Sequence, residues 1–417
     1  MQEYIKITDT QKQQLLKESD SFCMLPWVSV HQTPEGTIGP CCISNFESEP
    51  VDIHTVEGIA NSDDLKEIRM DMLNGVRNSR CRICYDQEDA HPNTISNRTD
   101  SNREFAEYFD AVHKTQPDGT LDDFKLRYLD IRFSNLCNMK CRSCGTGYSS
   151  QWETEFKQHP DDRIDIIEQV AMSLTDPEAS LASIMPHVPH LHRAYFAGGE
   201  PLITREHYVI LKELLANGRD DLQIIYNTNI SNLKYGGEEL VDLWQQFPER
   251  VRIFASIDAH GDAAGFIRHG VDWETIERNY KSLQKVDNID LNITTTVTAL
   301  NYCLLPDFIM YMYDNDMLPH LWQLNMAFSP DYLASTVLPI NVRKKAFIKT
   351  MEVIERISPK LENPNYFDSW RNILYSNMQY DQWQELNDEF KYRMNRLDNI
   401  RGESITTVIP QLAELFK

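Results

Sequence analysis

Short runs rich in β-forming residues recur along the chain from residue 126 onward, and stretches with helical spacing of apolar residues separate them. Such short runs are typical of strands, whereas apolar residues at i, i+3, i+4 and i+7 are typical of amphipathic helices. Such helices are predicted over residues 205–216 and 273–286, among others. The predicted strands cover residues 128–133, 193–197, 223–227, 252–257, 291–298 and 320–328.

Strands that alternate with helices imply βαβ crossovers and a parallel sheet. These six units are too few for a closed barrel, which needs about eight. We therefore predict an α/β fold, with a partial (β/α)6 TIM-like barrel over residues 126–335. A cysteine-rich region at 1–95 and a polar connector at 96–125 precede the barrel, and helical spacing predicts a C-terminal helical cap at 336–417.

The composition limits the classes of function. The 417 residues exceed one ordinary domain, and 41% of them are hydrophobic, which is enough for a packed core. The formal net charge of −22 disfavours nucleic acid as a partner, because a phosphate backbone needs the opposite sign. Residues 1–20 are polar and no run of about 18 apolar residues occurs, so we expect neither a signal peptide nor a membrane span. In the cytoplasm, the expected location, the nine cysteines favour metal or redox chemistry.

Three cysteines directly follow the first predicted strand of the barrel. Cys137, Cys141 and Cys144 form a C-x3-C-x2-C motif on one short loop. Three thiolates can ligate three irons of a 4Fe-4S cluster and leave the fourth iron without a protein ligand. Catalysis on a metal needs such an open position, whereas structural sites are closed. A zinc site that lacks one ligand, or three buried thiols without a role, is the alternative.

Polar and glycine-rich segments follow the next predicted strands. Ligands of parallel α/β folds bind at the carboxyl ends of the strands, so these segments are expected to meet at one site. Each of them alone would be an ordinary turn or a surface ion pair. The segments are Gly198-Gly199-Glu200-Pro201, Asn227-Thr228-Asn229, Ser256-Ile257-Asp258 and Ile267-Arg268-His269-Gly270.

Taken together, the motifs resemble the radical S-adenosylmethionine (SAM) superfamily over about residues 126–335. The resemblance implies that the three cysteines hold a catalytic 4Fe-4S cluster whose open iron binds SAM. In that family the reduced cluster cleaves SAM, and the 5′-deoxyadenosyl radical that forms takes a hydrogen atom from the substrate. Ser143 stands where the family usually has an aromatic residue before the third cysteine, and Tyr148 could compensate.

The resemblance also assigns roles to the remaining segments of the barrel. It implies that Gly198, Gly199, Glu200 and Pro201 receive the ammonium group of SAM. The polar groups of SAM are expected near Asn229, Ser256 and Asp258. Its carboxylate is expected at Arg268, whose planar guanidinium can pair bidentately with such a group.

The cysteines of the N-terminal region form a second pattern. Cys23, Gly36 and Cys41 form a C-x12-G-x4-C run, and a C-x2-C pair, Cys81 and Cys84, follows downstream. This pattern resembles the SPASM/twitch extensions of radical SAM enzymes, which normally follow the catalytic domain and here precede it. The resemblance implies an auxiliary 4Fe-4S cluster on these four cysteines, with Cys42 as the alternative to Cys41. A structural zinc ion would suit two cysteine pairs as well.

The resemblance further implies a class of reaction and its partners. We expect a peptide or protein substrate that is crosslinked, epimerised or oxidised, and a reductant such as flavodoxin or ferredoxin. A radical SAM enzyme for a carbohydrate or nucleoside is one alternative, and a zinc-stabilised binding or regulatory protein is another. A SAM-binding redox sensor without turnover is a third. Cys303, alone after the fifth strand, is either a hydrogen-atom donor, as some radical SAM epimerases require, or a thiol without a role.

Overall fold

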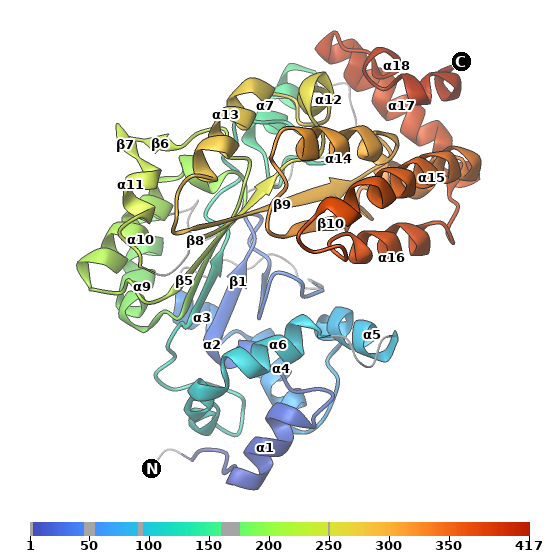
Figure 1. Cartoon of the computed structure of the whole chain (residues 1–417). Coiled ribbons are helices and arrows are strands. Elements are labelled where there is room, and N and C mark those ends of the chain that lie inside the picture. The colour runs from blue at the N-terminus through green and yellow to red at the C-terminus, as the bar shows by residue number, and fades with distance from the viewer. Residues whose placement is uncertain (1–2, 46–54, 91–94, 160–175, 249–250) are drawn as a thin grey trace.

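A single sheet of eight strands organises the molecule (Figure 1). The computed structural model describes residues 3–45, 55–90, 95–159, 176–248 and 251–417. The strand order across the sheet is β10-β9-β8-β5-β4-β3-β1-β2. The strands are β1 Ser29–Gln32, β2 Ile38–Gly39, β3 Tyr128–Ile131, β4 Arg193–Phe196, β5 Gln223–Thr228, β8 Val251–Ser256, β9 Ile289–Val297 and β10 Trp322–Met326. A separate two-stranded ribbon pairs β6 Lys234–Tyr235 with β7 Glu238–Glu239.

The six predicted barrel strands are all present. From β3 to β10 they lie side by side in chain order, and each pairs in parallel with its neighbours. Their observed ends fall within two residues of the predicted ones. The α/β fold with a partial, six-unit barrel is therefore confirmed, and the carboxyl ends of these strands form one edge where a ligand can bind.

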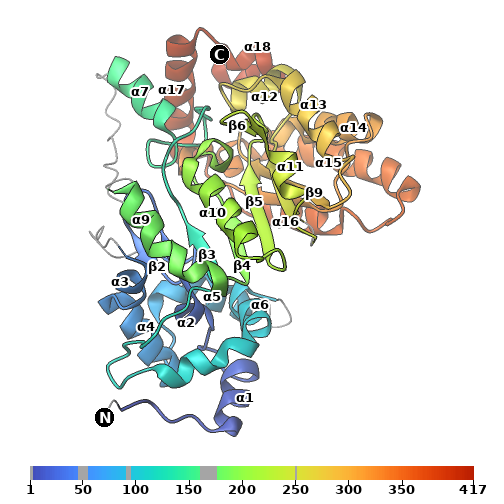
Figure 2. The same ribbon diagram turned by 90° about the vertical axis from the view of Figure 1, so that its left-hand side faces the viewer.

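Helices connect the strands of the barrel and cover its outer face, as Figure 2 shows for α10 in front of β4 and β5. The helix α10 turns one face inward, and this face buries Tyr208, Leu211 and Leu214. The apolar core lies between the helices and the sheet. These helices are α7 Ser150–Gln158, α9 Pro177–Ile184, α10 Arg205–Ala216, α11 Leu240–Trp244, α12 Gly261–Ile267, α13 Trp273–Leu283 and α14 Leu305–Asp314.

The N-terminal region extends the sheet, which the sequence analysis did not anticipate. Strand β1 pairs in parallel with β3, from Ser29 opposite Tyr128 to Gln32 opposite Ile131, and β2 pairs with β1. Without β1, the backbone groups along that edge of β3 would be unpaired, and an exposed edge strand can pair with another chain and aggregate. The region therefore builds part of the barrel wall. Its helices are α1 Asp9–Lys17, α2 Leu25–Val28, α3 Val56–Ala60, α4 Asp63–Leu73, α5 Arg82–Ala90 and α6 Asn97–Glu104.

Helices dominate the C-terminal region, as predicted, and the first two of them lie beside β10 at the other edge of the sheet (Figure 1). The indole Nε1 of Trp370 donates a hydrogen bond to the carbonyl of Trp322 on β10, at 3.0 Å. The two indole rings also meet edge to face. No helix in the described ranges is long and apolar enough to cross a membrane. The helices are α15 Ile340–Ile357, α16 Asp368–Asn377, α17 Trp383–Arg401 and α18 Ile405–Val408.

Candidate functional site

The three cysteines of the C-x3-C-x2-C motif lie on the loop between β3 and α7. Their thiols are free and line one cavity of about 450 Å³ at the carboxyl ends of the parallel strands. That volume is within the usual range for a small-molecule site. Burial raises the pKa of Cys137 and that of Cys144 to about 12. The thiols are therefore neutral unless a cationic group stabilises their thiolates, as bound iron would.

Most of the residues that the sequence analysis assigned to SAM line the same cavity. They come from the ends of three successive strands and from the segment after α12. Pro201 instead begins the buried 3-10 turn Pro201–Ile203, and Asp258 lies behind Arg268. The residues at the cavity are Gly198, Gly199, Glu200, Asn229, Ser256 and Arg268.

Backbone contact joins the glycine segment to the cysteine loop. The amide of Glu200 donates to the carbonyl of Leu136 at 2.8 Å, and the amide of Gly199 donates to that of Ser134 at 3.2 Å. A Cβ atom at Gly199 would lie 2.3 Å from the carbonyl oxygen of Leu136, which no side chain can tolerate. Gly198 has a φ of +130°, which favours glycine. The two glycines are therefore required for this close approach.

The carboxylate of Glu200 connects the ends of β4 and β5. Its Oε1 accepts from Thr228 Oγ1 at 2.6 Å and from the amide of Leu202 at 3.1 Å, and its Oε2 accepts from the amide of Asn229 at 2.8 Å. Burial raises the pKa of Glu200, and these donors oppose that shift. The side chain of Asn229 in turn donates to Asn138 on the cysteine loop at 3.0 Å. Three loops are thus held in one hydrogen-bond network.

Arg268 brings a positive charge to the cysteines. Its Nε lies 2.8 Å from Asp258 Oδ2, and its Nη1 lies 3.9 Å from the sulfur of Cys141. Burial opposes the charge on Arg268, but the Asp258 carboxylate more than offsets this and raises the pKa of the guanidinium. Burial also raises the pKa of Cys141, and Arg268 counteracts part of that effect. The arrangement suits a carboxylate ligand close to the cysteine loop.

The C-terminal region supports the cysteine loop from behind through Arg142. This side chain is fully buried, and its Nη2 lies 2.6 Å from both Asp398 Oδ1 and Glu403 Oε2. Its Nε donates to the carbonyl of Phe266 at 3.0 Å, and the guanidinium stacks 3.7 Å from that residue's ring. The sequence analysis missed this contact, because an arginine inside a loop gives no sign of carboxylates more than 250 residues away.

The structure adds two residues to the cavity that were not predicted from the sequence, His31 of β1 and Arg132 after β3. Tyr148, named above in place of the missing aromatic residue, and Cys42, named above as the alternative to Cys41, line the cavity as well. Alternation along β3 is the signal that could have indicated part of this, because Asp130 and Arg132 interrupt the apolar residues Leu129 and Ile131 of a buried strand.

Cys303 does not line this cavity. It lies next to a separate cavity, together with Lys345 and Lys349 of α15. The expectation of a hydrogen-atom donor at Cys303 therefore has no support from its position, because this residue, in the 3-10 turn Tyr302–Leu304 after β9, lines a different cavity. Burial raises the pKa of Cys303 to about 11, which suits a thiol without a role.

Four of the five N-terminal cysteines also lie around one cavity. Cys23, Cys41, Cys81 and Cys84 line a small, mainly apolar cavity, and Cys42 faces the larger cavity instead. Burial raises the pKa of Cys41 to about 11 and that of Cys81 to about 12. Among the described residues, no three His, Cys, Asp or Glu side chains stand as ligands of a single metal ion.

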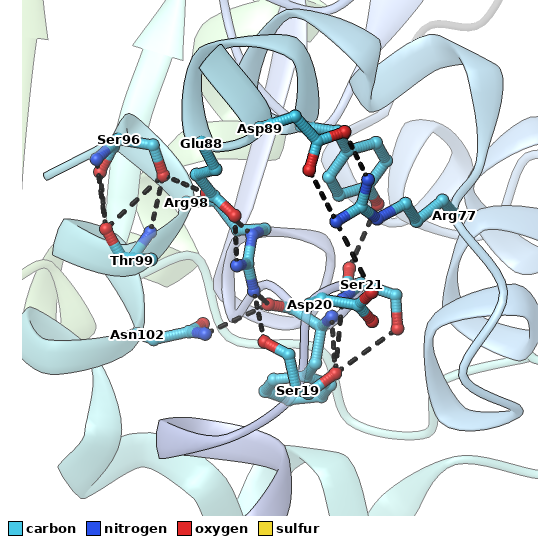
Figure 3. A network of polar contacts seen from close by, with 12 residues as sticks. Ser19, Asp20, Ser21, Arg77, Glu88, Asp89, Ser96, Arg98, Thr99 and Asn102 are labelled. Atoms are coloured by element: carbon cyan, nitrogen blue, oxygen red, sulfur yellow. Dashed lines mark hydrogen bonds and ion pairs between the residues drawn. The ribbon is translucent and has the colours of Figure 1, made fainter. Parts of the chain in front are cut away.

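A polar network holds the chain segments that carry these cysteines (Figure 3). The Nη1 of Arg98 donates to the carbonyls of Ser19 and Phe22, at 2.9 and 2.7 Å, just before Cys23. The Nε of the same arginine donates to Glu88 Oε1 of α5, at 3.0 Å. One buried guanidinium therefore fixes the approach of Cys23 to the helix that contains Cys84.

Comparisons with known proteins find partial structural likeness. No protein-family model and no curated protein matches the sequence. Native anSMEcpe with bound AdoMet (SAM) is 16% identical with a TM-score of 0.38, and the match covers 60% of this chain and 62% of that chain. The same protein with AdoMet and the Kp18Cys peptide is 15% identical with a TM-score of 0.38, covering 56% and 60%. TYW1 with a lysine-pyruvate adduct is 14% identical with a TM-score of 0.28, covering 48% and 61%.

The match spans about three fifths of those chains. At these identities and TM-scores, a function has to follow from the residues of this chain itself.

A Gly199→Ala variant tests the backbone contact at the cavity. The added methyl group would displace the carbonyl of Leu136, so we expect a loss of about 1–3 kcal/mol in the free energy of unfolding. We also expect less iron per chain after anaerobic reconstitution. Gly145→Ala is the matched control, since a Cβ there meets nothing within 4 Å. Equal stability and equal iron content in the two variants would contradict the assignment.

A Glu403→Gln variant tests the support behind the cysteine loop. It neutralises one of the two carboxylates that pair with buried Arg142, so urea unfolding should show a loss of about 1–3 kcal/mol at neutral pH. Burial opposes ionisation of Glu403, but His269 and Arg142 lower its pKa below the usual value. The stabilisation is therefore full above the unfolded pKa of about 4.3 and disappears as the pH falls through the folded pKa. Glu389→Gln, which breaks a surface pair on α17, is the control and should cost less than about 0.5 kcal/mol.

Proposed function

We propose that the protein is a radical SAM enzyme that acts on a peptide or protein substrate. One observation supports this most strongly: the three thiols of the C-x3-C-x2-C loop, the Gly-Gly-Glu segment and Arg268 line a single cavity. These groups lie far apart in the sequence, and the parallel strands bring them to one edge. The thiols of this cavity can ligate a cluster with an open iron, and its charged and polar groups can bind a zwitterionic ligand such as SAM.

The donor set fits a 4Fe-4S cluster with three protein ligands. Cys137, Cys141 and Cys144 would hold it, and all three thiols are free. When bound and reduced, such a cluster supplies the electron that cleaves SAM to methionine and a 5′-deoxyadenosyl radical. The protein's part is to place SAM against the open iron and the substrate against SAM.

The residues around the thiols are suited to orient SAM. Arg268 stays cationic beside Cys141 and would pair with the carboxylate of SAM. Glu200 already accepts three hydrogen bonds, and a carboxylate has about four acceptor sites, so one position is left for the ammonium group. Gly198 and Gly199 line the cavity and pack directly on the cysteine loop, so SAM would lie beside both segments. Asn229 and Ser256 provide polar groups on the wall of the cavity.

The N-terminal cysteines complete the proposal with a second cluster. Cys23, Cys41, Cys81 and Cys84 would close the coordination of an auxiliary 4Fe-4S cluster, which could conduct electrons or hold the region together. Cys41 is the ligand in this proposal, because Cys42 faces the other cavity. A structural zinc ion on the same four thiols is the alternative that an iron count distinguishes.

The partners follow from the same proposal. A reductant such as flavodoxin or ferredoxin would supply electrons, and the free thiols suit a reducing compartment such as the cytoplasm. The peptide or protein substrate rests on the resemblance of the N-terminal cysteine pattern to SPASM/twitch extensions. A carbohydrate or nucleoside substrate is the second candidate.

Iron and acid-labile sulfide, counted per chain after anaerobic reconstitution, test the two cluster sites. We expect about eight irons in the wild type and about four in the triple variant with Cys137, Cys141 and Cys144 replaced by Ala. About four irons falling to about zero would show that the N-terminal thiols hold zinc or nothing. Iron absent from both proteins would overturn the proposed function.

A Cys81→Ala variant separates the auxiliary site from the catalytic one. It should retain about four irons and part of the SAM cleavage but lose substrate turnover, because only the N-terminal cluster loses a ligand. Cys42→Ala is the control and should keep the full iron content, since its thiol faces the other cavity. An unaltered iron content in Cys81→Ala would count against the auxiliary cluster.

A further inference from the structure

The proposed SAM cavity contains a second buried arginine whose role is not yet assigned. Arg132 is only 7% exposed and lines the cavity directly after β3. Its Nη2 lies 2.9 Å from Asp130 Oδ1, and its guanidinium lies over the ring of Tyr195 at 4.7 Å. Its Nη1 is buried and has no acceptor in hydrogen-bond geometry. A buried, charged donor without an acceptor is costly unless a ligand supplies one.

The groups around Arg132 keep it charged. Asp130 is fully buried, and its Oδ2 lies 3.2 Å from His31 Nδ1. Burial opposes the charge on Arg132, but Asp130 more than offsets this and raises the pKa of the guanidinium. The thiol of Cys42 lies against Asp130 and Arg132 in the same part of the cavity. This end of the cavity thus combines one available cationic donor with one thiol.

Arg132 repeats the arrangement of Arg268 at a distance. Each arginine pairs with a buried aspartate from the sheet, Asp130 on β3 and Asp258 just after β8. Strands β4 and β5 lie between β3 and β8, so the two pairs come from strands that are not neighbours. Arg268 lies next to Cys141, whereas Arg132 lies next to Cys42. The cavity therefore has two cationic positions, and one zwitterion such as SAM needs a single carboxylate position.

We propose that Arg132 binds a carboxylate of the substrate and that the Cys42 thiol faces the substrate beside it. This inference rests on the proposed function, because Arg268 is reserved there for SAM. A carboxylate fits better than a phosphate, since a dianion would meet more repulsion from Asp130, which lies next to the Arg132 guanidinium. The substrate class is thereby narrowed to molecules with an acidic group, such as a peptide with an acidic side chain or a free C-terminus.

Alkylation of Cys42 with a charged and a neutral reagent of similar size tests the subsite. Iodoacetate has a carboxylate that Arg132 can bind, and iodoacetamide has none, so the ratio of their rates at Cys42 reports on the subsite. Rates are measured on the anaerobically reconstituted protein by tandem mass spectrometry, which distinguishes Cys42 from adjacent Cys41. Cys303, in its separate cavity, is the internal reference.

We expect an Arg132→Gln variant to lower the iodoacetate-to-iodoacetamide ratio at Cys42 about tenfold, because a hydrogen bond to a charged partner is lost. An Arg132→Lys variant should keep most of the ratio, and Cys303 should be unaffected in both. The same subsite can be tested in the wild type without a substitution. Acetate at constant ionic strength should slow the reaction of Cys42 with iodoacetate more than its reaction with iodoacetamide, because acetate competes for Arg132.

The inference is overturned if acetate slows both reagents equally in the wild type, or if Arg132→Gln folds normally and leaves the ratio unchanged. None of these rates requires SAM cleavage or a known substrate. A protein that cleaves SAM but shows no preference at Cys42 would therefore refute the carboxylate subsite and leave the proposed function intact. A protein that shows the preference at Cys42 but holds no iron would refute the proposed function and leave the carboxylate subsite intact.

Discussion

The close backbone contact between the cysteine loop and the segment after β4 is the constraint on which the candidate site depends. The amides of Gly199 and Glu200 donate to carbonyls of the cysteine loop, and no side chain fits between the two backbones. Because the contact is made by backbone atoms, it fixes the thiols relative to the strand ends. The network from Glu200 to Asn229 then extends this fixed relation to the end of β5.

Buried arginines define the remainder of the site. Arg142 connects the cysteine loop to the C-terminal helices, Arg268 brings charge to Cys141, and Arg132 occupies the part of the cavity next to Cys42. Each is paired with at least one carboxylate, which offsets the cost of burying its charge. Removal of one partner from a buried ion pair typically costs about 3–5 kcal/mol. Such pairs oppose movement of the segments that they connect, which suits the proposed binding of SAM and a substrate side by side.

Patterns of neighbouring residues were enough to predict the strands of the barrel and the polar segments at their ends. Short β-rich runs located the barrel strands, and strand ends followed by Gly-Gly-Glu or Asn-Thr-Asn located part of the cavity wall. Contacts made only in three dimensions were missed. The pairing of β1 with β3, the ion pairs of Arg142 with Asp398 and Glu403, and the opposite orientations of Cys41 and Cys42 each depend on segments distant in sequence. Asp130 and Arg132 are an intermediate case. Their positions in or next to a buried strand could be predicted from the sequence, but the residues that they contact could not.

Formation of 5′-deoxyadenosine tests the central claim most directly. The anaerobically reconstituted wild-type protein is reduced with dithionite, supplied with SAM, and assayed for 5′-deoxyadenosine by liquid chromatography and mass spectrometry. We expect 5′-deoxyadenosine and methionine to form in equal amounts and only under reduction. If the protein holds about four irons on Cys137, Cys141 and Cys144 and still forms no 5′-deoxyadenosine from SAM, it is not a radical SAM enzyme.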